Sequence, residues 1–151
     1  MNLKTLVGSG DRIGLAVLPV LAVGLTANIF APQVFRVGGP PAALRTASWI
    51  VLVPGLAVWA WSVILILIKV PRGELITGGP YALVKHPLYT GVALLVLPWL
   101  GFLLNSWLGA LVGIALYIAS RRFARAEEAA LAKTFGPAWD AYLAKVKLPW
   151  I

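Results

Sequence analysis

Two long segments of the chain carry no charged residue. They run from residue 13 to residue 35 and from residue 46 to residue 68, and basic residues bound both of them. A helix over either segment would be about 34 Å long, which is enough to cross a hydrocarbon layer of about 30 Å. We therefore predict that both segments are transmembrane helices. An N-terminal signal peptide over residues 1–31 is the alternative for the first, but its apolar part is longer than a typical signal core.

A third uncharged segment, residues 87–120, is too long for a single crossing, since one helix over it would measure about 50 Å. Asn105 and Ser106 interrupt it near the middle and predict a turn. We expect a hairpin of two short helices over 88–104 and 107–121, the first kinked at Pro98. The predicted fold is an all-α integral membrane protein with four transmembrane helices and a cytoplasmic helical C-terminal segment, forming one domain over 1–151.

The composition supports this fold class and excludes several functions. Hydrophobic residues make up 60% of the chain and charged residues 12%, against about 45–50% and about 25% in soluble domains. The chain has no cysteine and one histidine, His86, so we expect no metal site. The net charge of +8 would suggest nucleic acid in a soluble protein. Here the basic residues flank apolar segments, so we expect membrane lipids as partners instead.

Four crossings would place the N-terminus, the 69–87 loop and the C-terminal tail on one side of the membrane. The other side would hold only Arg36 and Arg45. Because basic residues accumulate in cytoplasmic loops, we predict that both termini are cytoplasmic, in the inner membrane of a bacterium or an archaeon. All acidic residues fall on the same side. The basic residues predicted there are Lys4, Arg12, Lys69, Arg72, Lys85, Arg121, Arg122, Arg125, Lys133, Lys145 and Lys147.

The loop before the predicted hairpin combines flexible and rigid residues. Gly78 and Gly79 permit unusual backbone angles, and Pro80 follows them with a fixed φ. Pro87 fits the first turn of a helix, which puts His86 at the helix N-cap, where exposed N–H groups attract an anion. An ordinary interfacial loop is the alternative interpretation.

A second polar cluster follows the predicted hairpin. Arg121, Arg125 and Glu128 are spaced to lie on one face of a helix. Glu127 interrupts an apolar stripe, and a carboxylate there is costly unless it is paired. A functional site and a salt-bridged helix end both fit this pattern.

The C-terminal tail contains a predicted break between two helices. Gly136 is typical of a helix C-terminus, and Pro137 of the first position of the next helix. Phe135, Trp139 and Tyr142 recur at helical spacing. Packing on the membrane surface and folding over the polar loop would both produce that spacing.

Two blocks in this region resemble the isoprenylcysteine carboxyl methyltransferase family of integral-membrane enzymes. The first is GPY at 79–81 with KHPLYTG at 85–91, and the second is EEAAL at 127–131 with FG at 135–136, Tyr142 and a closing LP at 148–149. Lys85 stands where the family usually has arginine, which keeps the charge but loses the planar guanidinium. Phospholipid N-methyltransferases and membrane sterol reductases are similar in the same region.

The resemblance implies an S-adenosylmethionine-dependent membrane methyltransferase that acts on a lipophilic acceptor, with a carboxylate favoured as in isoprenylcysteine carboxyl methylation. A phospholipid N-methyltransferase is the alternative, and a nicotinamide-dependent membrane reductase or a non-enzymatic membrane scaffold are alternatives of other classes. The implied catalytic residues are Arg121, Arg125, Glu127 and Glu128. The implied cofactor-binding residues are Gly79, Pro80, Tyr81, Lys85, His86, Pro87, Tyr89, Gly91, Glu128 and Tyr142. These roles require that the His86 loop and the Glu127–Glu128 segment meet at one pocket.

Overall fold

The computed structural model describes residues 10–38 and 41–148, so Lys4 and Pro149 lie outside the described residues. This part of the chain is helical and contains no β-strand, only two isolated bridge pairs. The helices are α2 (Gly10–Phe30), α3 (Pro32–Phe35), α4 (Pro41–Lys69), η1 (Val70–Arg72), η2 (Gly79–Ala82), α5 (Pro87–Gly91), η3 (Val92–Val96), α6 (Leu97–Leu103), α7 (Leu108–Phe135) and α8 (Pro137–Leu143).

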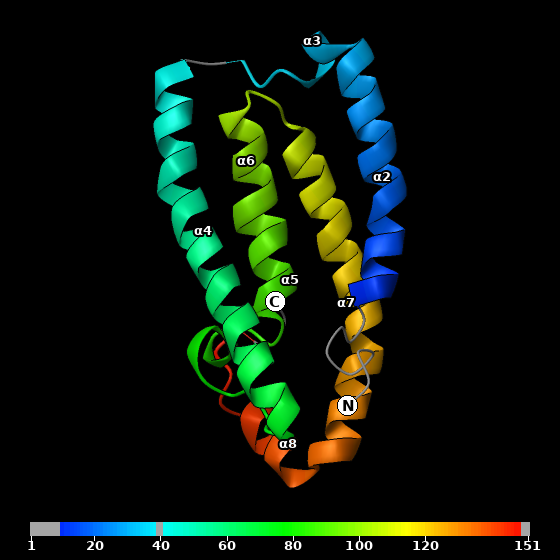
Figure 1. Cartoon of the computed structure of the whole chain (residues 1–151), viewed down its shortest axis with the longest axis vertical. Helices are drawn as coiled ribbons and strands as arrows, with labels where there is room; N and C mark the ends of the chain where they lie inside the picture. The colour runs from blue at the N-terminus through cyan, green and yellow to red at the C-terminus, as the bar shows by residue number, and fades with distance from the viewer. Residues whose placement is uncertain (1–9, 39–40, 149–151) are drawn as a thin grey trace.

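The long helices stand side by side in a bundle, with α6 and α7 in the middle (Figure 1). Helix α4 packs on α6 and its neighbour η3, and helix α2 packs on α7. The chain direction alternates from one helix to the next along the sequence. The start of α2, the loop after α4, the start of α5 and helix α8 therefore all lie in the lower half of Figure 1.

Helices α2 and α4 are long and apolar enough to cross a membrane, over Gly10–Phe30 and Ala42–Arg72. Both expose large apolar side chains, such as Leu15 on α2 and Trp49 on α4. A soluble protein rarely exposes so much contiguous apolar surface, whereas lipid is a favourable neighbour for it. The third apolar helix, Pro87–Leu103, is shorter.

The first predicted helix, 13–35, is wrong at its C-terminal end. Helix α2 stops at Phe30, and Ala31 has a non-helical φ of −136°. Proline disfavours the helical conformation of the residue before it, so Pro32 breaks the helix at Ala31. The chain then forms the separate short helix α3. The second predicted helix, 46–68, lies within α4, which begins earlier, at Pro41.

Helices α5, η3 and α6 form one continuous rod that is widened to a π-helical turn over Val92–Val96. The wide turn directly precedes Pro98, which has no N–H to donate and whose ring needs space. The turn that follows contains Asn105 at a φ of +55°, and the amide of Ser106 donates to the carbonyl of Gly101 at 2.8 Å. The chain then reverses into α7.

Glycines permit α7 to approach α6 and η3 closely. A Cβ atom at Gly109 would overlap the carbonyl oxygen of Leu97, and one at Gly113 would overlap the carbonyl oxygen of Ala93. Small residues at such crossings increase the dispersion contacts that hold helices together in lipid, where no hydrophobic effect drives association.

The helix predicted over 107–121 is wrong at its C-terminal end, because α7 continues to Phe135. The added segment is rich in alanine and also contains two glutamates and two arginines, all of which are strong helix formers. It ends where the sequence predicts, since Gly136 has a φ of +48° and Pro137 begins α8. Helix α7 thus extends well below the start of α2 and carries the second polar cluster to the lower end of the bundle (Figure 1).

Candidate active site

The C-terminal segment folds over the loop between α4 and α5. Trp139, Tyr142 and Val146 are buried together in a hydrophobic cluster that also contacts Leu75 and Phe135. The backbone amide of Leu148 donates to the carbonyl of Leu83 at 2.8 Å, and Tyr142 Oη donates to the carbonyl of Tyr81 at 2.9 Å. Of the two arrangements that the aromatic spacing permits, the structure has the one in which the tail covers the loop.

The loop itself is held against α4 at Gly79. This residue has a φ of +61°, which side chains with a Cβ rarely adopt. A Cβ atom there would lie 3.0 Å from the Trp61 ring, tighter than ordinary van der Waals contact. Pro80 follows and is buried. The Gly79-Pro80 pair therefore fixes the path of the backbone that leads to Lys85 and His86.

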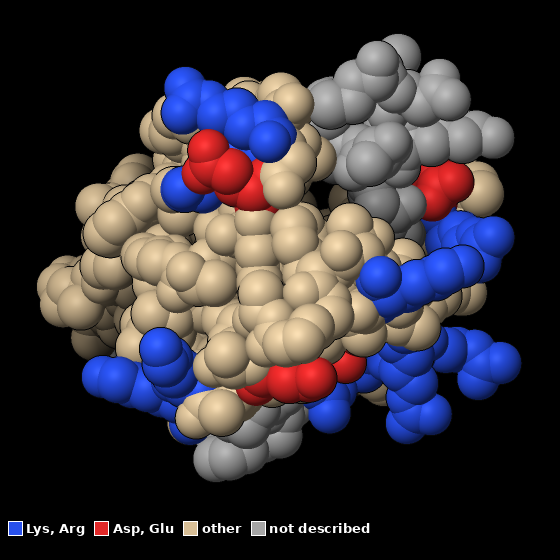
Figure 2. Space-filling model, turned by 90° about the horizontal axis from the view of Figure 1, so that it is seen from below, with Lys and Arg blue, Asp and Glu red and all other residues tan. Residues whose placement is uncertain are grey.

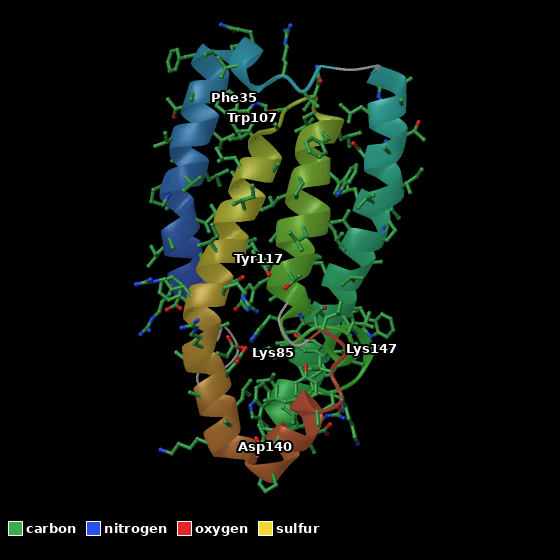
Figure 3. All side chains as sticks on the ribbon, turned by 180° about the vertical axis from the view of Figure 1, so that it is seen from behind. Phe35, Lys85, Trp107, Tyr117, Asp140 and Lys147 are labelled. Atoms are coloured by element: carbon green, nitrogen blue, oxygen red, sulfur yellow. The ribbon has the colours of Figure 1, made fainter. Side chains whose placement is uncertain are left out.

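Glu128 of α7 joins the loop to the helix through one carboxylate oxygen. Lys85 Nζ lies 2.6 Å from Glu128 Oε1, and His86 Nε2 lies 3.0 Å from the same atom. The side chains of Lys85 and His86 are 13% and 12% exposed, and that of Glu128 is 28% exposed. The two stretches that the sequence separates by about forty residues therefore meet, and Figure 3 shows Lys85 beside α7.

These contacts set the ionisation of the carboxyl group. The hydrogen bond from His86, with the charge and hydrogen bond of Lys85, lowers the pKa of Glu128 to about 2, although burial acts in the opposite direction. A hydrogen-bonded carboxylate beside a cation is stabilised in its charged form. Glu128 is thus ionised throughout the neutral range.

A second acidic group acts on the tyrosines of this region. Burial and, after it, the charge of Glu127 raise the pKa of Tyr81. Burial raises the pKa of Tyr142 to about 12, with the charge of Glu128 adding to the effect. Both phenols are therefore protonated near neutral pH and able to donate hydrogen bonds.

A pocket of about 220 Å³ opens between the loop, the start of α5 and α7. Its lining combines charged groups with small buried ones. Lys85, His86, Arg121, Arg125 and Glu128 supply the ionisable side chains, and Thr90, Ser120 and Ala124 complete the wall. The volume is smaller than the 300–1,000 Å³ or so of typical ligand pockets, so it suits the reacting end of a larger molecule.

The structure thus brings together five of the residues singled out in the sequence: Lys85, His86, Arg121, Arg125 and Glu128. The other candidates do not line this pocket. Gly79, Pro80 and Tyr81 shape the loop, Pro87 is the first residue of α5 after His86 at its N-cap, and Tyr142 anchors the tail. Tyr89 lies near the His86 ring, at 6.3 Å between ring centroids, and Gly91 packs toward Val58 of α4. Contact of these residues with a cofactor stays a prediction, as does a catalytic role of Glu127.

The sequence analysis did not identify Thr90, Ser120 and Ala124 as pocket residues. Helical spacing is the signal that identifies them. Thr90 follows His86 by four residues, and Ser120 and Ala124 precede Glu128 by eight and four, so each lies on the same helical face as a recognised candidate.

Basic side chains gather at the end of the bundle that holds the pocket. Figure 2 views this end and shows Lys and Arg at several places around its edge, with acidic groups between them. The opposite end carries Arg36 and Arg45. Among residues 10–38 and 41–148, no group of three or more His, Asp and Glu side chains is placed to hold a metal ion.

A protein-family model, and no individual known protein, identifies the family of the chain. Neither a curated protein sequence nor a solved structure matches it. The family model for the isoprenylcysteine carboxyl methyltransferases matches residues 44–133. That range covers more than half of the chain and includes every residue that lines the pocket. The chain therefore belongs to the isoprenylcysteine carboxyl methyltransferase family, a family of integral-membrane methyltransferases.

Proposed function

We propose that the protein transfers the methyl group of S-adenosylmethionine to the carboxylate of a lipophilic acceptor, at the pocket between the His86 loop and α7. The observation that carries the proposal is the junction of Lys85 and His86 with Glu128, because it joins the two family blocks in one polar pocket. The bound cofactor supplies a methyl group on a sulfonium, which a nucleophile takes in one displacement while the electron pair of the broken bond stays on sulfur.

The proposal includes a membrane orientation. The four crossings are α2, α4, the Pro87–Leu103 rod and the first half of α7. The pocket end of the bundle faces the cytoplasm, because most basic residues lie at that end and the cofactor is cytosolic. A lipophilic acceptor then reaches the pocket from the bilayer, and the cofactor reaches it from water.

Pocket charge favours an anionic acceptor. Lys85, Arg121 and Arg125 bring three cations to the lining, and Glu128 is the acidic residue among the lining residues. A carboxylate is stabilised by such a set, whereas a protonated amine headgroup is repelled by it. Arginine binds carboxylates in a planar, two-pronged geometry. Arg121 and Arg125 would thus orient the acceptor, and Glu128 would keep Lys85 and His86 in place.

The ionised state of Glu128 also favours a carboxylate over an amine as the acceptor. An amine acceptor must lose a proton before it attacks, and an efficient general base has a pKa near the working pH. The pKa of Glu128, about 2, is far too low for that task. A carboxylate acceptor needs no base, since it is already ionised. Alignment of the reacting atoms is then the main contribution of the protein.

The test uses the purified protein in lipid nanodiscs. We expect calorimetry to show binding of the demethylated cofactor, S-adenosylhomocysteine, and binding about ten-fold weaker or worse for Glu128→Gln. Glu74→Gln is the matched control, since Glu74 forms an ion pair of the same 2.6 Å length with Lys69 outside the pocket. No binding by the folded wild-type protein would refute the proposal.

The acceptor class is read from the chemistry of the product. Membranes are incubated with S-adenosylmethionine labelled in the methyl group, and the lipid and protein fractions are treated with mild alkali. A methyl ester releases labelled methanol, whereas an N-methyl amine keeps its label. We expect that mild alkali releases the label as methanol, as it does from a methyl ester. Label that stays in a phospholipid headgroup after this treatment would contradict a carboxylate acceptor.

A further inference from the structure

One hydroxyl group in the pocket lacks the hydrogen bond that comparable groups make. The buried serines of the bundle, Ser48 and Ser62 on α4 and Ser120 in the pocket wall, each donate to a main-chain carbonyl of their own helix at 2.7 or 2.8 Å. Thr90 is only 9% exposed, yet within residues 10–38 and 41–148 its hydroxyl makes no hydrogen bond. A helical threonine ordinarily bonds a carbonyl of the preceding turn.

The free hydroxyl belongs to a residue that lines the pocket. In the described part of the chain, every fully buried side-chain nitrogen or oxygen has a hydrogen-bond partner. The unbonded oxygen of Thr90 therefore still has access to open space, and Thr90 lines the pocket. Because this hydroxyl has no protein partner among the residues that the structure describes and is accessible, it is available to donate a hydrogen bond to a ligand oxygen placed against it.

The pocket has two chemically different ends. From Ser120 to Glu128 the α7 wall extends about 12 Å along the helix axis. Glu128, Lys85 and His86 form the ionic end. Thr90 lies four residues beyond His86 along α5, toward the middle of the bundle, so this second end of the pocket is nearer to the membrane interior.

We infer that the Thr90 hydroxyl donates a hydrogen bond to the acceptor carboxylate and thereby sets the preference for that acceptor, an assignment that rests on the proposed function. The acceptor comes from the bilayer, and the hydroxyl end is the part of the pocket nearest to it. Thr90 and Arg121 are brought to the same pocket by different helices, so together they hold the carboxylate from two directions. Thr90 acts here as a binding residue, and it moves no proton in the reaction.

The test separates acceptor binding from cofactor binding. Thr90→Val removes the hydroxyl and keeps the shape, whereas Thr90→Ser keeps the hydroxyl. Ser62→Ala is the control for loss of a buried hydroxyl, since Ser62 lies on α4 outside the pocket and is fully buried. Each variant is assayed with N-acetyl-S-farnesylcysteine as a lipophilic carboxylate, and its affinity for S-adenosylhomocysteine is measured by calorimetry.

We expect Thr90→Val to raise KM for the farnesylated carboxylate about ten-fold or more, with cofactor affinity within two-fold of the wild type. Thr90→Ser should restore most of the loss, and Ser62→Ala should leave KM unchanged. Unchanged KM in Thr90→Val, or an equal loss of cofactor affinity, would overturn the assignment while the proposed function stands. If the wild-type protein binds the cofactor but methylates no carboxylate, the proposed function fails and the assignment fails with it.

Discussion

The Glu128 carboxylate contacts the Lys85 ammonium and the His86 imidazole through one oxygen, so its neutralisation should affect stability as well as binding. Glu128→Gln keeps the size and one oxygen acceptor but removes the charge. Lys85 would then keep its positive charge in a site that leaves its side chain only 13% exposed, without a counter-ion. An unpaired charge of this kind is costly because burial removes most of its hydration.

The loss of folding stability in Glu128→Gln should lie between the values known for exposed and for fully buried ion pairs. Exposed ion pairs contribute about 0–1 kcal/mol, and breaking a fully buried pair costs about 3–5 kcal/mol. Because Glu128 is 28% exposed and its partners about half that, we expect a loss of roughly 1–3 kcal/mol. For a chain of this size that corresponds to a fall in the unfolding temperature of about 3–10 °C.

The assay is thermal unfolding in one detergent at one protein concentration, followed by tryptophan fluorescence. Glu74→Gln is measured in parallel and should change the midpoint by less than about 2 °C, because its ion pair with Lys69 is exposed. Equal midpoints for the Glu128→Gln and wild-type proteins, or equal shifts for both variants, would show that the junction between loop and α7 does not stabilise the fold.

Three further outcomes are expected. The folded pKa of Glu128 lies below its ordinary value of 4.5, so the contribution of this carboxylate to stability is complete above about pH 4.5 and is lost as the pH falls toward 2. Thermal unfolding measured between about pH 6 and about pH 3 should therefore show a loss of stability in the wild type that is absent in Glu128→Gln. Gly109→Ala should cost about 1–3 kcal/mol of stability, seen as a lower unfolding temperature, because the added Cβ would overlap a carbonyl of the neighbouring helix. The control is Gly14→Ala on α2, where the added Cβ meets open space and should be neutral or slightly stabilising. Equal effects of the two substitutions would contradict the close crossing of α6 and α7. Tyr142→Phe removes the hydrogen bond to the Tyr81 carbonyl and should speed proteolysis of the C-terminal segment, with about 1 kcal/mol lost; an unchanged cleavage rate would argue against a tail anchored to the loop.

Local sequence rules predicted the helices well wherever one residue type decides the backbone. Uncharged segments located α2, α4 and the Pro87–Leu103 rod, and the Gly136-Pro137 pair located the break between α7 and α8. The same rules misplaced the end of α2. The uncharged segment continues to residue 35, so the prediction extended the helix past Pro32, which in fact ends it. The end predicted at residue 121 for the last bundle helix was wrong for a related reason, since the loss of hydrophobicity there marks a change of surroundings and not a change of backbone.

The sequence by itself determined which chemistry is possible: apolar helices, one histidine, a few acids at one end, and two motif blocks that identify the family. Tertiary structure alone decided which of those residues meet. It joined Lys85 and His86 to Glu128, set Glu127 apart from the pocket lining, and exposed Thr90 to the same pocket. The physical reason is that helical periodicity assigns a residue to a face but not to a neighbour. The neighbours depend on how α7 packs against the loop and on the tail that closes over it.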